Sequence, residues 1–279
     1  MVEAQGPAQG GSGVVSKAVG SLKKLAQLIK RLRAADRTEA GAQDAPTLFQ
    51  HAPGSLGEPI ITELVYSLLL GDSSTSAARS AMKRLTEGVV DANELRVWMP
   101  TEIASCIGER YPAACERALR IKSSLWEIQR RQHVVSLEHL TGQPAREARA
   151  YLDSIEGVTK FAASRVALGC LSIPCVPLDA RLAALLTHEG VLEDDAPLNE
   201  ASSWLIRNIE PADAGLIHKL FQSWSDEEGH APKPQDHTTT DAPAKRRPGK
   251  AAPRPAKART TSTRSAKSTS SPRSSKSKG

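Results

Sequence analysis

The residues best placed for chemistry lie between Pro144 and Leu186. There the sequence predicts a helix, a short turn, a second helix, a proline-bounded loop and a third helix. The turn spans residues 155–159 (Ile-Glu-Gly-Val-Thr). Gly157 can adopt a positive φ and lets another backbone approach closely, and the amides after it, at a helix N-terminus, can hydrogen-bond a phosphate oxygen. We therefore interpret the turn as a clamp for a nucleic-acid backbone, independent of base sequence.

A second candidate is the carboxylate of Asp179, which follows Pro177 and precedes a helix rich in Ala and Leu. In its ordinary interpretation Asp179 is an N-cap, whose side chain accepts a backbone hydrogen bond at the start of that helix. A carboxylate at a helix N-terminus also stays ionised and is held in one place. The N-cap role and a catalytic role are therefore compatible, and the sequence leaves both open.

The hairpin and the aspartate together resemble the helix-hairpin-helix DNA glycosylases of the endonuclease III type. The hairpin of that family usually reads Leu-Pro-Gly-Val-Gly, and a short apolar loop ending in Val-Asp follows it. Here residues 177–181 (Pro-Leu-Asp-Ala-Arg) stand in that place, with Asp179 twenty-two residues after Gly157. Residues 61–70 also resemble the helix that leads into the family's DNA-wedge loop, so the resemblance spans about residues 58–224.

The resemblance implies base excision. The target nucleotide is flipped out of the duplex, and Asp179 then stabilises the positively charged sugar or activates water at its anomeric carbon. Phe161 is placed to line the pocket and stack on the expelled base, although a role in the hydrophobic core explains it equally well. The DNA-binding residues that we predict are Gly157, Val158, Thr159, Lys160, Arg165 and Arg181. Solvated surface charge is the plainer explanation of either arginine taken singly.

The sequence also departs from the family pattern. Bifunctional members carry a nucleophilic lysine four residues after the hairpin glycine, where this chain has Phe161. Lys160 is adjacent, but one residue along a helix is a rotation of about 100°, so its amine points elsewhere. A lyase step through a Schiff base is therefore not expected. Thr159 replaces the second hairpin glycine, and the acidic Asp72 stands near the position of the family's wedge-loop glutamine.

Two functions follow from these matches and departures. The first is a monofunctional DNA N-glycosylase of base-excision repair, which Asp179 favours. The second is a catalytically inactive DNA-binding or chromatin-associated protein, which Thr159, Phe161 and Asp72 favour. In either case we expect the partner to be double-stranded DNA and the protein to be a cytoplasmic, nucleoid- or DNA-associated monomer. No apolar run approaches the ~20 residues that cross a bilayer.

No metal or cofactor is expected. The chain has four cysteines and none after Cys175, so the iron–sulfur cluster of many relatives cannot form at its usual C-terminal location. Two cysteine pairs that lie apart in sequence suggest reduced thiols rather than a metal site. The family's hairpin commonly holds a monovalent cation on backbone carbonyls, and the resemblance extends that option to this chain.

Composition predicts an all-α fold with a basic tail. Ala and Leu dominate the apolar positions, and only 4% of the residues are aromatic, which favours packed helices. The net charge of +6 is uneven, because residues 245–279 hold twelve Lys and Arg and no Asp or Glu. Residues 1–244 therefore carry 6 − 12 = −6. A polycation of this kind attracts nucleic acid.

The chain divides into three parts. For residues 1–57 the sequence predicts a disordered segment, a basic amphipathic helix at about residues 14–35 and a linker. Residues 58–228 predict the helix-hairpin-helix domain, with two helical subdomains and a cleft between them. Residues 229–279 are rich in Lys, Arg, Ala, Pro and Ser and predict a disordered tail. Further helices are predicted at residues 60–70, 74–85, 100–108, 112–132, 197–207 and 211–224.

Overall fold

The computed structural model describes residues 19–35, 51–108 and 110–228, and these residues form helices and no β-strand. The all-α class is therefore confirmed for the described part of the chain. The segments predicted to be disordered at residues 1–13 and 229–279 lie outside the described residues, as does the linker predicted over residues 36–57 up to residue 50. The end of that linker belongs to the fold instead, because Leu56 is buried in the core and Ala52 packs against it. None of the described helices combines the length and the hydrophobicity that crossing a bilayer requires.

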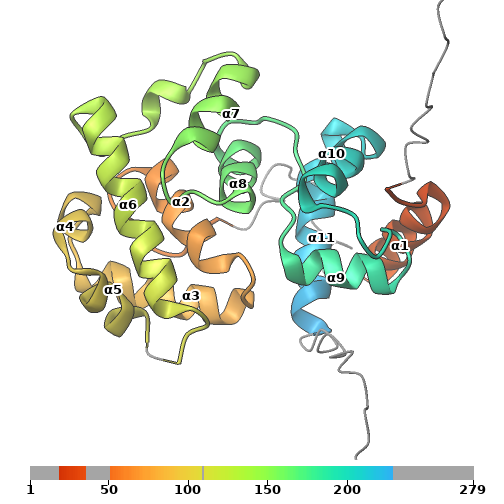
Figure 1. Cartoon of the computed structure of the whole chain (residues 1–279), viewed down its shortest axis with the longest axis horizontal. Helices are drawn as coiled ribbons and strands as arrows, with labels where there is room; N and C mark the ends of the chain where they lie inside the picture. The colour runs from red at the N-terminus through yellow and green to blue at the C-terminus, as the bar shows by residue number, and fades with distance from the viewer. Residues whose placement is uncertain (1–18, 36–50, 109, 229–279) are drawn as a thin grey trace, which may run out of the picture. The chain divides into compact units, whose positions relative to one another are not determined.

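A first hydrophobic core is built entirely from residues between Leu56 and Cys175. Its helices are α2 (Pro59–Leu70), α3 (Thr75–Gly88), α4 (Ala92–Val97), α5 (Pro100–Ile107), α6 (Ala114–Gln132), α7 (Ala145–Ser154) and α8 (Lys160–Cys170). Helix α2 is central: every residue from Ile60 to Leu70 is buried, and it packs against α3, α6 and α8 (Figure 1). A helix that is apolar all round is stable only when neighbours surround it.

Helix α6 presents the stripe that its sequence predicts. Ala114, Ala118, Ile121, Leu125 and Ile128 are all buried, and the helix packs against α2, α4 and α5. Its N-terminus lies two residues later than predicted because Ala113 adopts a left-handed φ of 53°.

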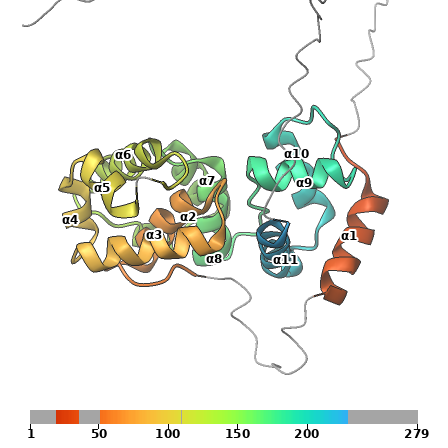
Figure 2. The ribbon, with the colours of Figure 1, turned by 90° about the horizontal axis from the view of Figure 1, so that it is seen from below.

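A second core joins the C-terminal helices to the N-terminal one. It contains α9 (Ala180–His188), α10 (Leu198–Asn208), α11 (Ala214–Glu227) and α1 (Leu22–Ala35). Leu25, Leu28 and Leu32 of α1 are buried, and α1 lies beside α11 (Figure 2). Ion pairs at the rim join Arg31 to Glu189 and Arg33 to Asp213. The predicted basic helix therefore docks on the protein.

The helices differ from the prediction in two other places. Helix α1 begins at Leu22, while residues 14–18, where its start was predicted, lie outside the described residues. Helix α4 was not predicted, although its start is capped: the Asp91 side chain accepts from the Glu94 amide, and the Glu94 carboxylate accepts from the amide of Val90, one residue before the N-cap. Six residues are too few for a visible hydrophobic period.

Candidate active site

The predicted hairpin joins α7 to α8, with Gly157 at a φ of 82°. A Cβ at this position would lie 2.6 Å from the backbone oxygen of Arg120 in α6. Two features therefore require glycine at this position: the positive backbone angle and the close approach of the hairpin to α6.

The N-terminus of α8 is only partly free to bind an anion. Thr159 is its N-cap, with its side-chain oxygen 3.2 Å from the Ala162 amide, and the Val158 amide donates to Ile155 within the turn. The amides of Lys160 and Phe161 belong to the first turn, whose N–H groups have no acceptor within a helix. The predicted phosphate clamp would therefore consist of these two amides and the exposed Lys160 side chain.

A cavity of about 590 Å³ opens beside this helix end. Its walls come from the start of α8, the loop after α2, the loop before α9 and one face of α10. Phe161 lies in the wall and is 6% exposed; its ring packs against the backbone of Gly71, where a Cβ would be 3.1 Å away. Phe161 therefore belongs both to the core and to the cavity wall.

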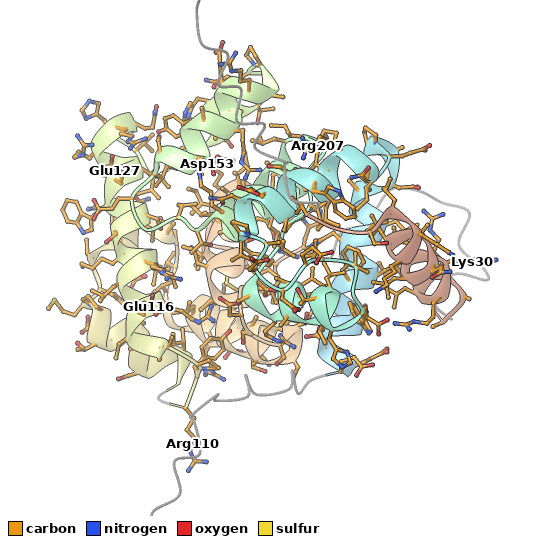
Figure 3. The ribbon with its side chains drawn as sticks, turned by 45° about the vertical axis from the view of Figure 1, so that its right-hand side comes forward. Lys30, Arg110, Glu116, Glu127, Asp153 and Arg207 are labelled. Atoms are coloured by element: carbon orange, nitrogen blue, oxygen red, sulfur yellow. The ribbon has the colours of Figure 1, made fainter. Side chains whose placement is uncertain are left out.

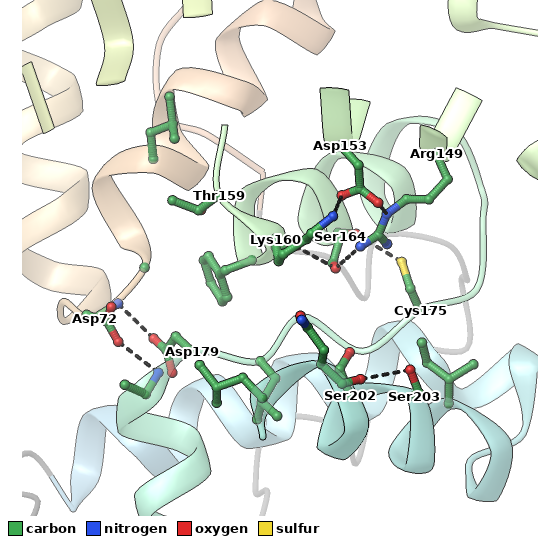
Figure 4. A pocket seen from close by; sticks show the side chains of 18 of the residues that line it. Asp72, Arg149, Asp153, Thr159, Lys160, Ser164, Cys175, Asp179, Ser202 and Ser203 are labelled. Carbon is green, nitrogen blue, oxygen red and sulfur yellow. Dashed lines mark hydrogen bonds and ion pairs between the residues drawn. The ribbon is translucent and has the colours of Figure 1, made fainter. Parts of the chain in front are cut away.

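Asp179 lies in the same wall and caps α9 (Figure 4). Its Oδ1 accepts from the Leu182 amide at 2.8 Å, and its Oδ2 accepts from the Asp72 amide at 2.8 Å. The residue is only 8% exposed. Burial raises the pKa of the Asp179 carboxyl, and the neighbouring Asp72 charge raises it further, while the two amides and Arg181 oppose the shift. Asp179 is thus an N-cap that also faces a cavity.

The loop after α2 is fastened to α6. The buried Arg117 guanidinium donates to the carbonyl oxygens of Leu68, Leu69 and Gly71 at 2.7, 2.7 and 2.5 Å. Its position at the C-terminus of α2 suits a cation, since the helix dipole is negative there. Asp72 follows with a φ of 53°, and its Oδ1 accepts from the Ala180 amide at 2.9 Å.

The opposite wall holds a polar network that sequence reasoning missed. Arg149 pairs with Asp153 at 3.2 Å and donates to the Ser164 hydroxyl at 2.8 Å. Lys160 lies 3.3 Å from the other oxygen of Asp153 (Figure 4). Figure 3 shows Asp153 where α7 faces α10. The spacing of Arg149 and Asp153, one helical turn apart, predicts their pairing, but it does not show that they face a cavity.

Arg165 corrects one prediction. It was assigned to a phosphate contact, but its side chain is 2% exposed and pairs with the buried Glu63 at 3.0 Å. Its Nη1 also lies 2.8 Å from Nε2 of His218. Because a guanidinium only donates, that nitrogen accepts, and the ring is neutral. Burial, with the Arg165 charge beside it, lowers the pKa of His218 well below its usual value.

The Arg181 side chain, also predicted to contact DNA, forms hydrogen bonds within the protein. It donates to the backbone oxygens of Ser73 and Ser225, and its side chain is 21% exposed. These bonds tie the loop after α2 to α9 and α11. The start of α9 is also a poor place for a phosphate, because the carboxylates of Asp179 and of Asp72 from the loop after α2 both lie there.

We expect Arg165→Met to lower the free energy of unfolding by about 3–5 kcal/mol, because it leaves the buried Glu63 without its cation. Urea denaturation measures the change. The double variant Arg165→Met/Glu63→Gln should recover part of the loss, since it removes both charges. The salt dependence of DNA binding should stay at the parental slope in the folded variant; a smaller slope would restore the phosphate-contact interpretation.

Several solved structures share this fold. One is an endonuclease III–DNA covalent intermediate, which is 15% identical with a TM-score of 0.58 over 77% of this chain and 91% of that chain. A second is the H. pylori 3-methyladenine DNA glycosylase MagIII bound to 1,N6-ethenoadenine, at 15% identity and a TM-score of 0.53 over 72% of this chain and 97% of that one. A third is the Clostridium acetobutylicum 8-oxoguanine glycosylase/lyase with double-stranded DNA, at 13% identity and a TM-score of 0.52 over 75% and 70%.

The chain thus has the fold of the endonuclease III-like helix-hairpin-helix DNA glycosylases, as its hairpin and spaced aspartate predict. No family model and no curated protein matches the sequence.

Proposed function

We propose that this protein is a monofunctional DNA N-glycosylase of base-excision repair that acts on double-stranded DNA. The observation that carries the proposal is the cavity in which Asp179 and Phe161 share a wall beside the open N-terminus of α8. The neighbours in fold are named as an endonuclease III and as DNA glycosylases, and they include complexes with DNA.

The chain's own residues supply each step of such a reaction. The amides of Lys160 and Phe161 hold a phosphate next to the cavity, so the nucleotide flips toward it. The Phe161 ring offers an apolar face to the base. As the glycosidic bond lengthens, positive charge grows on the sugar, and the Asp179 carboxylate, which is only 8% exposed, stabilises that charge at short range.

A catalytically inactive DNA-binding protein is the second candidate. It is favoured by the two amide hydrogen bonds that occupy both oxygens of Asp179. In that case the carboxylate would only join α9 to the loop after α2.

The cysteines do not fit an iron–sulfur cluster. Cys106 lies in α5, Cys115 in α6, Cys170 at the end of α8 and Cys175 in the loop before α9. Burial raises the pKa of Cys170 to about 12 and that of Cys175 to about 11, which disfavours the thiolate that binds iron. We therefore propose that the protein works without a cluster. A monovalent cation on the hairpin carbonyls stays a prediction.

Release of free base from duplexes that carry different lesions tests the proposal. We expect at least one lesion to be excised in single-turnover conditions, leaving an abasic site. If every duplex keeps its base while the protein binds DNA, the inactive DNA-binding protein is the correct description.

We also expect no lyase activity. Abasic DNA should stay uncut, and borohydride should trap no covalent complex, because Phe161 stands where an amine is needed. The exposed Lys160 amine is paired with Asp153 at 3.3 Å. A trapped adduct that disappears in Lys160→Ala would contradict the prediction and identify the amine.

A further inference from the structure

Asp72 is an exposed carboxylate that lines the same cavity as the buried Asp179. The two residues hold each other: the Asp72 amide donates to Asp179, and the Asp72 Oδ1 accepts from the amide that follows Asp179 (Figure 4). Within the described part of the chain, Oδ2 of Asp72 has no hydrogen-bond donor. Asp72 therefore keeps one oxygen free on a carboxylate whose other oxygen is fixed.

The position of Asp72 is set by its surroundings. Its left-handed backbone angle of 53° is uncommon outside glycine, although Asp and Asn adopt it more readily than most residues. On one side Arg117 binds the carbonyl of Gly71, and on the other Arg181 binds the carbonyl of Ser73. The backbone on both sides of Asp72 is thus held by α6 and α9, and the carboxylate itself is held by the Ala180 amide of α9.

Hydrolysis of an N-glycosidic bond requires both stabilisation of the sugar cation and activation of a water molecule, and these two tasks call for carboxylates in different surroundings. The growing charge on the sugar needs a fixed anion, and the attacking water needs a base with a free lone pair. Asp179 is fixed, because each of its oxygens accepts one N–H group, and at 8% exposure its remaining lone pairs have little access to water. Asp72, by contrast, is exposed to water and its Oδ2 accepts no hydrogen bond from the described residues.

We propose that Asp72 is a second catalytic carboxylate, the general base that activates water, while Asp179 stabilises the sugar. The proposal rests on the proposed glycosylase function. The water oxygen bonds to the anomeric carbon as the bond from that carbon to the base nitrogen breaks, and the bonding pair leaves with the base. The water proton passes to Oδ2 of Asp72 and then to the departing base, so the carboxylate is regenerated.

The test compares Asp72→Asn and Asp72→Ala in the full chain, on the duplex that the parental protein excises best. Asn tolerates the left-handed backbone and can still accept from the Ala180 amide, so Asp72→Asn keeps the structural role and loses the base. Asp91→Asn is the matched control, because Asp91 caps α4 outside the cavity. Single-turnover excision, DNA affinity and thermal melting are measured on all four proteins.

We expect both Asp72 variants to lose about 10²-fold or more in excision rate, with DNA affinity unchanged or tighter, while Asp91→Asn keeps the parental rate. Asp72→Asn at the parental rate overturns the proposal, and a loss confined to Asp72→Ala shows that Asp72 only caps α9. If the parental protein itself excises nothing, the proposed function fails and this role of Asp72 fails with it. Excision by the parent with unaffected Asp72→Asn rejects the second carboxylate alone.

Discussion

Asp179→Asn is expected to lower single-turnover base excision by about 10²–10⁴-fold. An uncharged amide cannot stabilise a developing cation on the sugar. DNA affinity should be unchanged or slightly higher, because the substitution removes a negative charge near the phosphates. Gel-based excision assays and a binding titration on the same preparations measure both quantities.

The structural interpretation of Asp179 predicts a different result. Asn keeps one acceptor for the Leu182 amide but turns an NH₂ toward the Asp72 amide, so a loss of about 1 kcal/mol in the free energy of unfolding is expected from hydrogen bonding alone. Asp91→Asn controls for the loss of a charged N-cap. Excision by Asp179→Asn at the parental rate would leave Asp179 as a cap and show that another group carries the chemistry.

The raised pKa of Asp179 adds a pH dependence with a definite sign. Burial makes the carboxyl take up its proton at a higher pH than an ordinary aspartate. The excision rate should therefore fall with decreasing pH through that raised pKa, above the range in which exposed aspartates titrate. Folding responds in the opposite direction, since a group that binds its proton more tightly in the folded state opposes folding as pH rises.

Deletion of residues 245–279 is expected to weaken DNA binding by about 10²-fold or more at low salt. The deleted segment holds twelve Lys and Arg and no acidic residue. Each cation that contacts a phosphate contributes about 0.9 to the slope of log affinity against log salt, so the slope should flatten. Fluorescence anisotropy over a salt series measures it.

The preference among lesions should not change on deletion, because contacts to phosphates carry no base information. A chain of full length with the twelve tail cations replaced by Gln is the matched control, and it should behave like the truncated protein. An unchanged salt slope in both variants would show that the tail does not contact DNA.

The sequence predicts the hairpin well because its signals are local. A glycine at a turn, small residues after it and a 3.6-residue apolar period depend on neighbouring residues, and they place α7, α8 and α6 correctly. The capping role of Asp179 is local in the same sense.

The failures involve partners distant in sequence. Arg165 lies on a helix of mostly small and apolar residues, and the partners that hold it in the interior are Glu63, 102 positions away, and His218, 53 positions away. The contact between Asp72 and Asp179 spans 107 positions and has no counterpart in the spacing of the sequence. The sequence shows that these residues are charged, but only the fold determines whether a charged side chain faces solvent and DNA or pairs with another charged residue in the interior.

The docking of α1 has a consequence for the order in which the protein folds during synthesis. The first core needs only residues 56–175, which leave the ribosome as one continuous segment. The second core needs Leu25, Leu28 and Leu32 together with α11, and its rim pair of Arg33 and Asp213 joins residues 180 positions apart. At about 5–20 residues per second, α1 waits on the order of ten seconds or more with its leucines uncovered. The packing of α1 is therefore among the last parts of the fold to be completed, and a nascent chain halted before α11 would present that leucine stripe to chaperones.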